Sequence, residues 1–202
     1  MKSLSKRTGD RRLTVNVSFL QLYNEKIYDL LNRDMFKPQK QGKMMFKMLR
    51  NADDGLKLKW NQYDVYTVEN LLNVECESVD EILHLFHYGL QNKTIGSHKM
   101  NMTSSRSHTI FCITVEQTLA SNPDNTIISK LQIVDLAGSE RQSFVKTEGV
   151  AQKESIEINK SLFTLRKVIT ALTEKTVKQN NGQDVKDIYI PYRDSKLTCL
   201  LR

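Results

Sequence analysis

Cysteine, proline and glycine are scarce in this 202-residue chain, and its hydrophobic runs are short. The three cysteines (Cys76, Cys112 and Cys199) are scattered and lack metal-ligand spacing, which excludes a disulfide framework and is typical of a reducing cytosol. Three prolines and eight glycines exclude collagen-like and low-complexity classes. No apolar stretch approaches the roughly 18 residues of a membrane-spanning helix. The segment after the basic first residues is too polar for a signal-peptide core.

The remaining composition is that of a globular domain, with 39% hydrophobic and 26% charged residues. Its net charge of +7 is unevenly distributed. Residues 1–50 hold 12 basic and 4 acidic side chains, residues 51–100 hold 4 and 8, and residues 151–202 hold 10 and 6. Basic ends favour an acidic partner, which composition alone leaves open among nucleic acid, an anionic membrane and an acidic protein polymer.

Hydrophobic periodicity predicts an α/β fold, in which helices pack on a central sheet. Ser78 and Glu81 form a capping box that predicts the start of one helix. The mostly apolar segment 129–136 predicts a central strand. Strands are also expected at 13–22, 56–68 and 109–115, short helical turns at 23–32, and helices at 154–176 and from Pro191 onward.

The expected helix at 154–176 has two distinct faces. A stripe at steps of four and three predicts the buried face, and four lysines lie roughly opposite it. Those lysines form either a solvated face or a binding surface. The stripe comprises Ile158, Leu162, Leu165, Ile169 and Leu172, and the lysines are Lys153, Lys160, Lys167 and Lys175.

His84 and His87 lie three residues apart on the helix that Ser78 opens. This spacing suggests a metal pair, but no third ligand follows at a suitable distance. The pair is therefore interpreted as part of a helix surface.

The first motif with chemical meaning joins Asp135 to Gly138, at the end of an apolar strand. An aspartate at a strand tip can hold magnesium through water, and a glycine lets its backbone N–H approach a terminal phosphate closely. The same pattern also fits an ordinary strand followed by a turn, so alone it does not decide for nucleotide chemistry.

The second motif is a group of hydroxyls and an arginine just before a strand, at residues 101–108. Ser104 and Ser105 can ligate magnesium or orient water near a phosphate, and Arg106 can pair with an acid such as Glu140. His108 beside the strand is typical of a structural hydrogen-bonding residue. A serine-rich turn is the alternative interpretation.

Together, Asn101-Met102-Thr103-Ser104-Ser105-Arg106-Ser107-His108 and Asp135-Leu136-Ala137-Gly138-Ser139-Glu140-Arg141 resemble switch I and switch II of the kinesin motor domain. Three more segments agree with this resemblance in order and spacing. They are Phe19 to Leu31, the run Asn159-Lys160-Ser161-Leu162, and Ile190 to Thr198. The resemblance covers almost the whole chain. It implies a partial P-loop NTPase fold over residues 1–202, as a single partial motor domain.

The resemblance implies a microtubule-stimulated ATPase with ATP and Mg²⁺ as its cofactors in the complete motor. Ser104 and Ser105 would bind the nucleotide, Ser105 and Asp135 would hold the metal, and Gly138 would sense the terminal phosphate. Arg106 and Glu140 would close the site as a salt bridge, which makes them catalytic together with Ser105 and Gly138. The expected microtubule contacts are Asn159, Lys160, Arg193 and Lys196, with Lys178 and Lys186 as possible additions.

The chain departs from the family pattern at one essential motif. It has no Gly-x-x-x-x-Gly-Lys-[Ser/Thr] segment, whose backbone N–H groups, lysine and hydroxyl hold phosphates and magnesium. The resemblance therefore predicts a chain that starts after this phosphate cradle and stops before the last strand and helix of the family. Weak ATP binding, no stepping and an open, apolar sheet edge are expected. Cys199 stands where many relatives have a basic residue.

Two function classes follow from the resemblance. One is a segment of a microtubule motor that couples ATP hydrolysis to movement, located in the cytoplasm on the microtubule cytoskeleton. The other is a non-catalytic microtubule-binding module with an incomplete nucleotide site. Nucleic-acid binding has little support, because aromatic stacking clusters and zinc spacings are missing from the sequence. No membrane span is expected, and dimerisation would depend on regions outside this chain.

Overall fold

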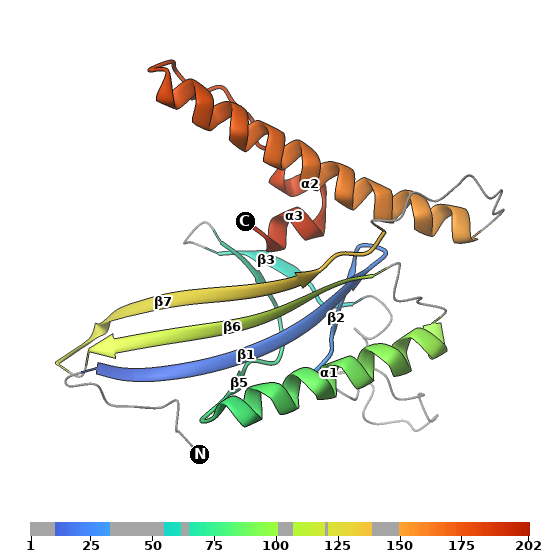
Figure 1. Ribbon diagram of the computed structural model, residues 1–202, viewed down its shortest axis with the longest axis vertical. Helices are drawn as coiled ribbons and strands as arrows, with labels where there is room; N and C mark the ends of the chain where they lie inside the picture. The colour runs from blue at the N-terminus through green and yellow to red at the C-terminus, as the bar shows by residue number, and fades with distance from the viewer. Residues whose placement is uncertain (1–10, 33–54, 62–64, 101–106, 120, 139–149) are drawn as a thin grey trace.

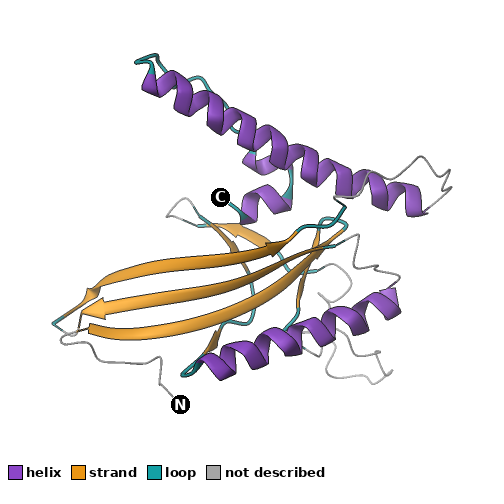
Figure 2. Cartoon of the chain, in the orientation of Figure 1, coloured by secondary structure: helices purple, strands orange, loops and turns teal. Residues whose placement is uncertain are grey.

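The computed structural model describes residues 11–32, 55–61, 65–100, 107–119, 121–138 and 150–202. A five-stranded antiparallel sheet forms the centre, with the order β2-β1-β6-β7 and with β5 paired to β1. Helix α1 covers one face, and α2 and α3 lie over the other (Figures 1 and 2). The five strands are β1 (Arg11–Tyr23), β2 (Lys26–Asp29), β5 (Val74–Glu75), β6 (His108–Leu119) and β7 (Asn122–Asp135).

A separate two-stranded hairpin, three α-helices and a 3₁₀ turn complete the described fold. The hairpin pairs β3 (Leu58–Trp60) with β4 (Tyr66–Val68). The helices are α1 (Val79–Met100), α2 (Val150–Asn180) and the short α3 (Lys196–Leu200), and a 3₁₀ turn η4 (Tyr192–Asp194) precedes α3. None of the described helices is long and apolar enough to cross a membrane.

Strand β1 alternates buried apolar and partly buried polar residues from Val15 to Phe19, and both of its faces are buried from Phe19 to Tyr23. Val17 and Phe19 join the cluster that α1 covers, and Leu20 and Leu22 join the cluster on the α3 side. The alternation in this segment therefore correctly predicted a strand, which is longer at both ends than expected.

Helix α1 approaches the sheet very closely at Gly89. A Cβ atom at this position would lie 2.2 Å from the Phe19 ring, so only glycine fits there. Asn92 also ties α1 to the segment after β2, because its amide donates to the Leu30 carbonyl at 2.7 Å. Ser78 is confirmed as the N-cap, since the Glu81 N–H donates to Ser78 Oγ at 3.3 Å. The reciprocal bond of the predicted capping box is shifted by one residue, because the Glu81 carboxylate accepts the Glu77 N–H at 2.8 Å.

The prediction of helical turns at 23–32 is wrong. Residues 20–29 form the tight hairpin of β1 and β2, whose turn residues Asn24 and Glu25 both have positive φ angles of 49° and 56°. Such a turn matches the right-handed twist of the flanking strands. Neither residue is glycine, which hid the turn from a reading of the sequence.

Segment 129–136 belongs to β7 up to Asp135, but the expectation of a central strand is not met within the described residues. There β7 pairs only with β6, and its other edge is open. Leu131 is 58% exposed, and Ile127, Ile128 and Ile133 are exposed as well. The predicted open, apolar sheet edge is therefore present, and it is β7.

The buried face of α2 is displaced from the predicted stripe. Ser161, Thr164 and Val168 are buried, whereas Ile169 and Leu172 are exposed. The reason is that α2 meets the body of the molecule through a short stretch, in which Leu165 of the stripe also packs against the core, and then extends beyond the sheet (Figure 1). It also continues to Asn180, four residues past the predicted end.

Candidate functional site

The two sequence motifs meet at one end of the sheet. Strands β6 and β7 pair antiparallel with Thr109 opposite Asp135, so the start of β6 lies beside the end of β7. The segment that precedes β6 and the segment that follows β7 are therefore both attached at this end of the sheet. Ser104, Ser105, Arg106 and Glu140 lie outside the described residues, and the expected salt bridge between Arg106 and Glu140 stays a prediction.

Asp135 and Gly138 are the two nucleotide-site candidates that the structure describes. The Asp135 side chain is 70% exposed, and its Oδ2 lies 3.0 Å from Lys93 Nζ, which α1 contributes. Gly138 has a φ of +75°, in the left-handed region that favours glycine. The strand end thus presents an accessible carboxylate followed by a turn without a side chain.

These two residues fit one side of a Mg²⁺·ATP site. Carboxylate oxygen is a ligand that Mg²⁺ prefers, and this metal is usually held by one or two carboxylates plus water and phosphate oxygens. In the described part of the chain, no group of three or more His, Cys, Asp or Glu side chains could hold a metal ion. His84 and His87 are both exposed on α1, which agrees with their interpretation as a helix surface, and His87 Nδ1 lies 2.7 Å from the Leu83 carbonyl oxygen of the same helix.

His108 connects the two strand ends to α2. Its Nδ1 accepts a hydrogen bond from the Ala137 N–H at 3.0 Å, which leaves the proton on Nε2. Nε2 can then donate to Ser161 Oγ at 2.9 Å. Burial lowers the pKa of the His108 imidazole, and the Asp135 carboxylate opposes this shift only in part. His108 is therefore a neutral structural residue, as its position beside a strand indicated.

Ser107 is anchored just before it. Its Oγ accepts a hydrogen bond of 2.8 Å from the Gln21 side-chain amide, and both residues are buried. Ser107 of the predicted switch I is thus fixed to β1, and His108, the last residue of the same motif, is fixed to Ala137 of the predicted switch II.

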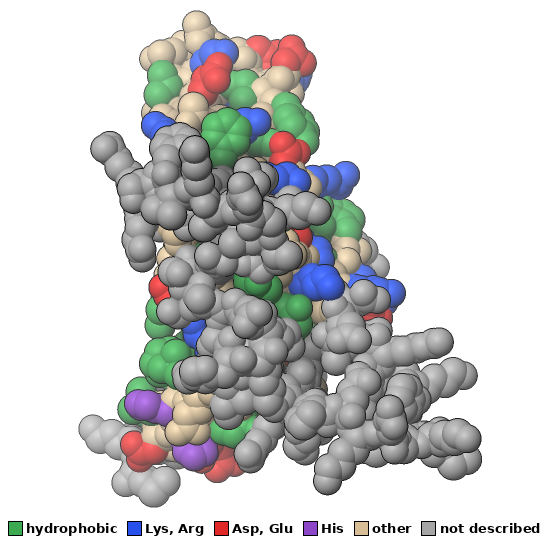
Figure 3. All heavy atoms as spheres, turned by 90° about the vertical axis from the view of Figure 1, so that its right-hand side faces the viewer, with side chains coloured by type: hydrophobic (Ala, Val, Ile, Leu, Met, Phe, Trp, Pro, Cys, Tyr) green, Lys and Arg blue, Asp and Glu red, His purple; other side chains and the backbone are tan. Residues whose placement is uncertain are grey.

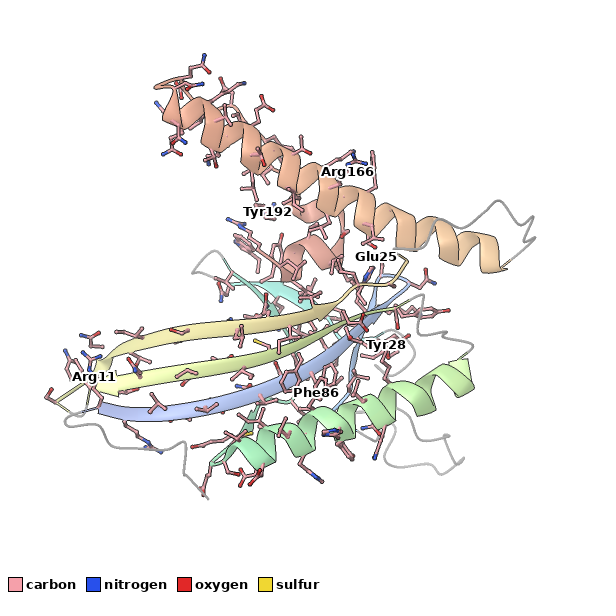
Figure 4. All side chains as sticks on the ribbon, viewed as in Figure 1. Arg11, Glu25, Tyr28, Phe86, Arg166 and Tyr192 are labelled. Carbon is pink, nitrogen blue, oxygen red and sulfur yellow. The ribbon has the colours of Figure 1, made fainter. Side chains whose placement is uncertain are left out.

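The expected microtubule contacts come from α2, η4 and α3. Lys160 and Arg193 are exposed and Lys196 is partly buried, whereas the side chain of Asn159 is outside the part described. Helix α3 is held by Glu25, whose carboxylate accepts the Lys196 backbone N–H at 2.9 Å (Figure 4). Basic, acidic and hydrophobic side chains are interspersed on the face that Figure 3 shows.

Cys199 and Lys178 are poorly suited to be microtubule contacts. Cys199 is buried, and its Sγ lies 3.2 Å from the Tyr192 carbonyl oxygen. Burial is the largest influence on its thiol and raises its pKa. Lys178 forms an i,i+4 ion pair with Glu174 at 2.7 Å.

Two residues that contact the candidate site residues could not be identified from the sequence, namely Lys93 and Trp60. Lys93 meets Asp135 across 42 residues of chain, and no local pattern in α1 marks it. Trp60 lies on β3, against Arg193 and Arg202 from the opposite end of the chain. Its being the only tryptophan was the single available hint.

A family model described as the kinesin motor domain matches residues 1–202. Kinesin-related protein 4 of Dictyostelium discoideum is 40% identical over 202 residues, covering 100% of this chain and 9% of the relative. Chromosome-associated kinesin KIF4A of Homo sapiens is 38% identical over 201 residues, covering 100% of this chain and 14% of the relative. The chain thus spans a small part of the curated relatives that it matches.

Solved structures agree with these matches. A structure described as a fast kinesin superposes with a TM-score of 0.72 at 33% identity, covering 98% of this chain and 48% of that one. A KIF14 structure, described as bound to AMP-PNP in complex with a microtubule, gives a TM-score of 0.69 at 35% identity, covering 96% and 49%. The described fold is therefore a partial α/β fold of the P-loop NTPase type found in these motors.

Proposed function

The chain belongs to the kinesin motor domain family, and from this premise we propose that it forms the switch and track-binding part of an ATP-driven microtubule motor. The observation that carries the proposal is the pairing of Thr109 with Asp135, which brings both switch segments to one edge of the sheet. His108 then links that edge to α2 through Ser161. A conformational change in the switch segments at the nucleotide site would therefore be transmitted to α2, the helix that is expected to face the microtubule.

In the complete motor, Asp135 would hold Mg²⁺ through water and Gly138 would donate its backbone N–H to the terminal phosphate. Bound Mg²⁺ would neutralise developing charge on the phosphates during hydrolysis. Ser104 and Ser105 would add nucleotide and metal contacts, and Arg106 with Glu140 would enclose the attacking water. In this chain, the Lys93 ammonium already neutralises part of the Asp135 charge.

The track contacts proposed are Asn159, Lys160, Arg193 and Lys196. Tubulin presents an acidic surface, so cations on α2, η4 and α3 would steer association and set its register. The site of action would then be the cytoplasmic microtubule cytoskeleton.

A non-catalytic microtubule-binding module is the second candidate, because the proposed track contacts do not depend on a phosphate cradle and these 202 residues contain none. Under this alternative the chain would bind microtubules with the same face, but without control by a nucleotide. The reading frame upstream of Met1 distinguishes the two, because a Gly-rich loop with a lysine there would complete the nucleotide site.

Co-sedimentation of the chain with microtubules, with and without ATP, tests the proposal. We expect pelleting at low salt that decreases as salt is added, because the contacts are mostly ionic. ATP should change little, since this chain lacks the cradle that supplies most phosphate hydrogen bonds. Absence of pelleting at low salt would overturn the track-binding assignment. Micromolar affinity for a fluorescent ATP analogue, with turnover, would overturn the expected weakness of the nucleotide site.

A further inference from the structure

Trp60 receives two guanidinium groups from the C-terminal segment. The Cζ atom of Arg202 lies 4.6 Å from the centre of a Trp60 ring, and that of Arg193 lies 5.4 Å from it. Tyr66 packs edge-on against the same indole, with ring centres 4.5 Å apart. Figure 1 shows the C-terminus beside the β3–β4 hairpin, in agreement with these contacts.

The aromatic arrangement places both guanidinium groups against one indole. Arg202 also lies 5.4 Å from the Tyr192 ring, so aromatic rings contact this guanidinium from two elements. Aromatic ring faces attract cations through their quadrupole, so Trp60 stabilises both guanidinium groups in these positions. Among the ion pairs that the described residues form, none neutralises Arg193 or Arg202.

The surface around this pair is open and mixed in character. Arg202 and Tyr192 line a hollow of about 400 Å³ together with Lys186 and one acid, Asp187. Tyr189, also in the lining, is 71% exposed. A basic pair with an exposed aromatic border is suited to a carboxylate-rich protein surface, because arginine binds carboxylates through two parallel hydrogen bonds.

We propose that Trp60 is a positioning residue that holds Arg193 and Arg202 as a fixed pair for carboxylates on the microtubule surface. This inference rests on the proposed function, and it adds Trp60 and Arg202 to the track-binding machinery. A free arginine must be ordered when it binds, and stacking on Trp60 orders both guanidinium groups before the partner arrives.

Three substitutions at Trp60 separate the ring from its volume. In co-sedimentation with microtubules, Trp60→Leu keeps apolar bulk but removes the quadrupole, and should weaken binding about fivefold. Trp60→Phe keeps a ring and should retain most of the affinity. Trp60→Ala should be at least as weak as Trp60→Leu. Lys59→Ala is the matched control, because Lys59 is the neighbouring hairpin residue and is paired with Glu69.

The salt dependence tests whether Trp60 acts through the arginines. Trp60→Leu leaves every charge in place, so the dependence of affinity on salt should stay close to that of the parent chain. Arg193→Ala combined with Arg202→Ala removes two charges and should flatten it. In that doubly substituted background, adding Trp60→Leu should weaken binding no further, as expected when two changes interrupt one interaction.

The outcomes separate this inference from the function on which it rests. If the parent chain does not pellet with microtubules, both the proposed function and the role of Trp60 are wrong. If the parent chain pellets and Trp60→Leu binds equally well, only the role of Trp60 is overturned. Additive losses in the combined variant would also overturn it, because Trp60 would then act independently of the arginines. Circular dichroism of each variant identifies losses that come from unfolding, and Trp60→Phe remains informative if Trp60→Ala fails to fold.

Discussion

His108 Nε2 and Ser161 Oγ lie 2.9 Å apart across 53 residues of chain, and both side chains are buried. Because Nδ1 of the same ring accepts the Ala137 N–H, one imidazole joins the start of β6, the end of β7 and the helix α2. The His108 ring is therefore a direct polar link between the strand ends and α2.

Ser161→Ala should lower the free energy of unfolding by about 1–3 kcal/mol, because the His108 Nε2–H would be left buried without its acceptor. Urea denaturation at pH 7.5 measures this change. Thr173→Ala is the matched control, since the Thr173 hydroxyl bonds to a carbonyl of its own helix on an exposed face. That control should change stability by less than about 0.5 kcal/mol. Equal effects of the two substitutions would contradict a special role for the His108 contact.

Stability should fall as the pH drops below about 6.5, the ordinary pKa of histidine. Burial lowers the pKa of His108 in the folded chain, so the unfolded chain takes up a proton first. The contribution of neutral His108 is complete above the unfolded pKa and is lost as pH falls towards the lower, folded pKa. The difference in unfolding free energy between the parent chain and His108→Gln, measured from pH 8 to pH 5, isolates this effect. A difference that does not change with pH would contradict it.

Gly89→Ala should destabilise the chain by about 1–3 kcal/mol, because the new methyl group would overlap the Phe19 ring. Helix propensity alone predicts the opposite sign, since alanine favours a helix over glycine by about 1 kcal/mol. The direction of the shift in denaturation midpoint therefore decides between the two effects. Phe19→Leu should lessen the cost of Gly89→Ala in the double variant, and strict additivity would argue against the predicted overlap.

Lys160→Ala should weaken microtubule binding roughly two- to fivefold, in keeping with the loss of one surface ionic contact. Lys175→Ala on the same helix is the control, because Lys175 is partly buried and is not among the proposed track contacts. Co-sedimentation at two salt concentrations measures both variants. Equal losses would show that general positive charge, and not the position of Lys160, determines binding.

The open edge of β7 should cause self-association. Exposed Leu131 and Ile133 stand beside unpaired backbone groups, a combination that favours pairing with a second chain. Leu131→Lys should increase the monomer fraction in sedimentation velocity. Ser129→Lys adds the same charge to the same strand without removing apolar surface, and should have the smaller effect. A parent chain that is monomeric at all concentrations would contradict the prediction.

Local signals made part of this fold predictable. The Ser78 N-cap and the alternation in β1 both depend on residues that are close in sequence, and both are confirmed. The family motifs correctly identified the family from residues 101–108 and 135–141. Whether the site residues act as the family implies stays a prediction.

The missed features depend on long-range contacts or on an unusual turn. The hairpin at Asn24 and Glu25 uses positive φ angles without glycine, so its sequence resembled a helical segment. The spacing of Ile169 and Leu172 correctly predicted a helix, but their burial was wrongly predicted. Both are exposed, because α2 extends beyond the sheet at this point. The pairing of Lys93 with Asp135 and of Trp60 with Arg202 requires the tertiary fold itself.

The place of β1 in the sheet also determines the order in which the chain can fold. Its neighbour β2 follows at once, but its long partner β6 lies far along the chain, as the 86-residue separation of Gln21 and Ser107 shows. At synthesis rates of about 5–20 residues per second, β1 would wait roughly 4–17 seconds before β6 exists. The bond from Lys196 to Glu25 closes later still, across 171 residues. A nascent chain therefore exposes an apolar strand for seconds, during which a chaperone would reduce misassembly.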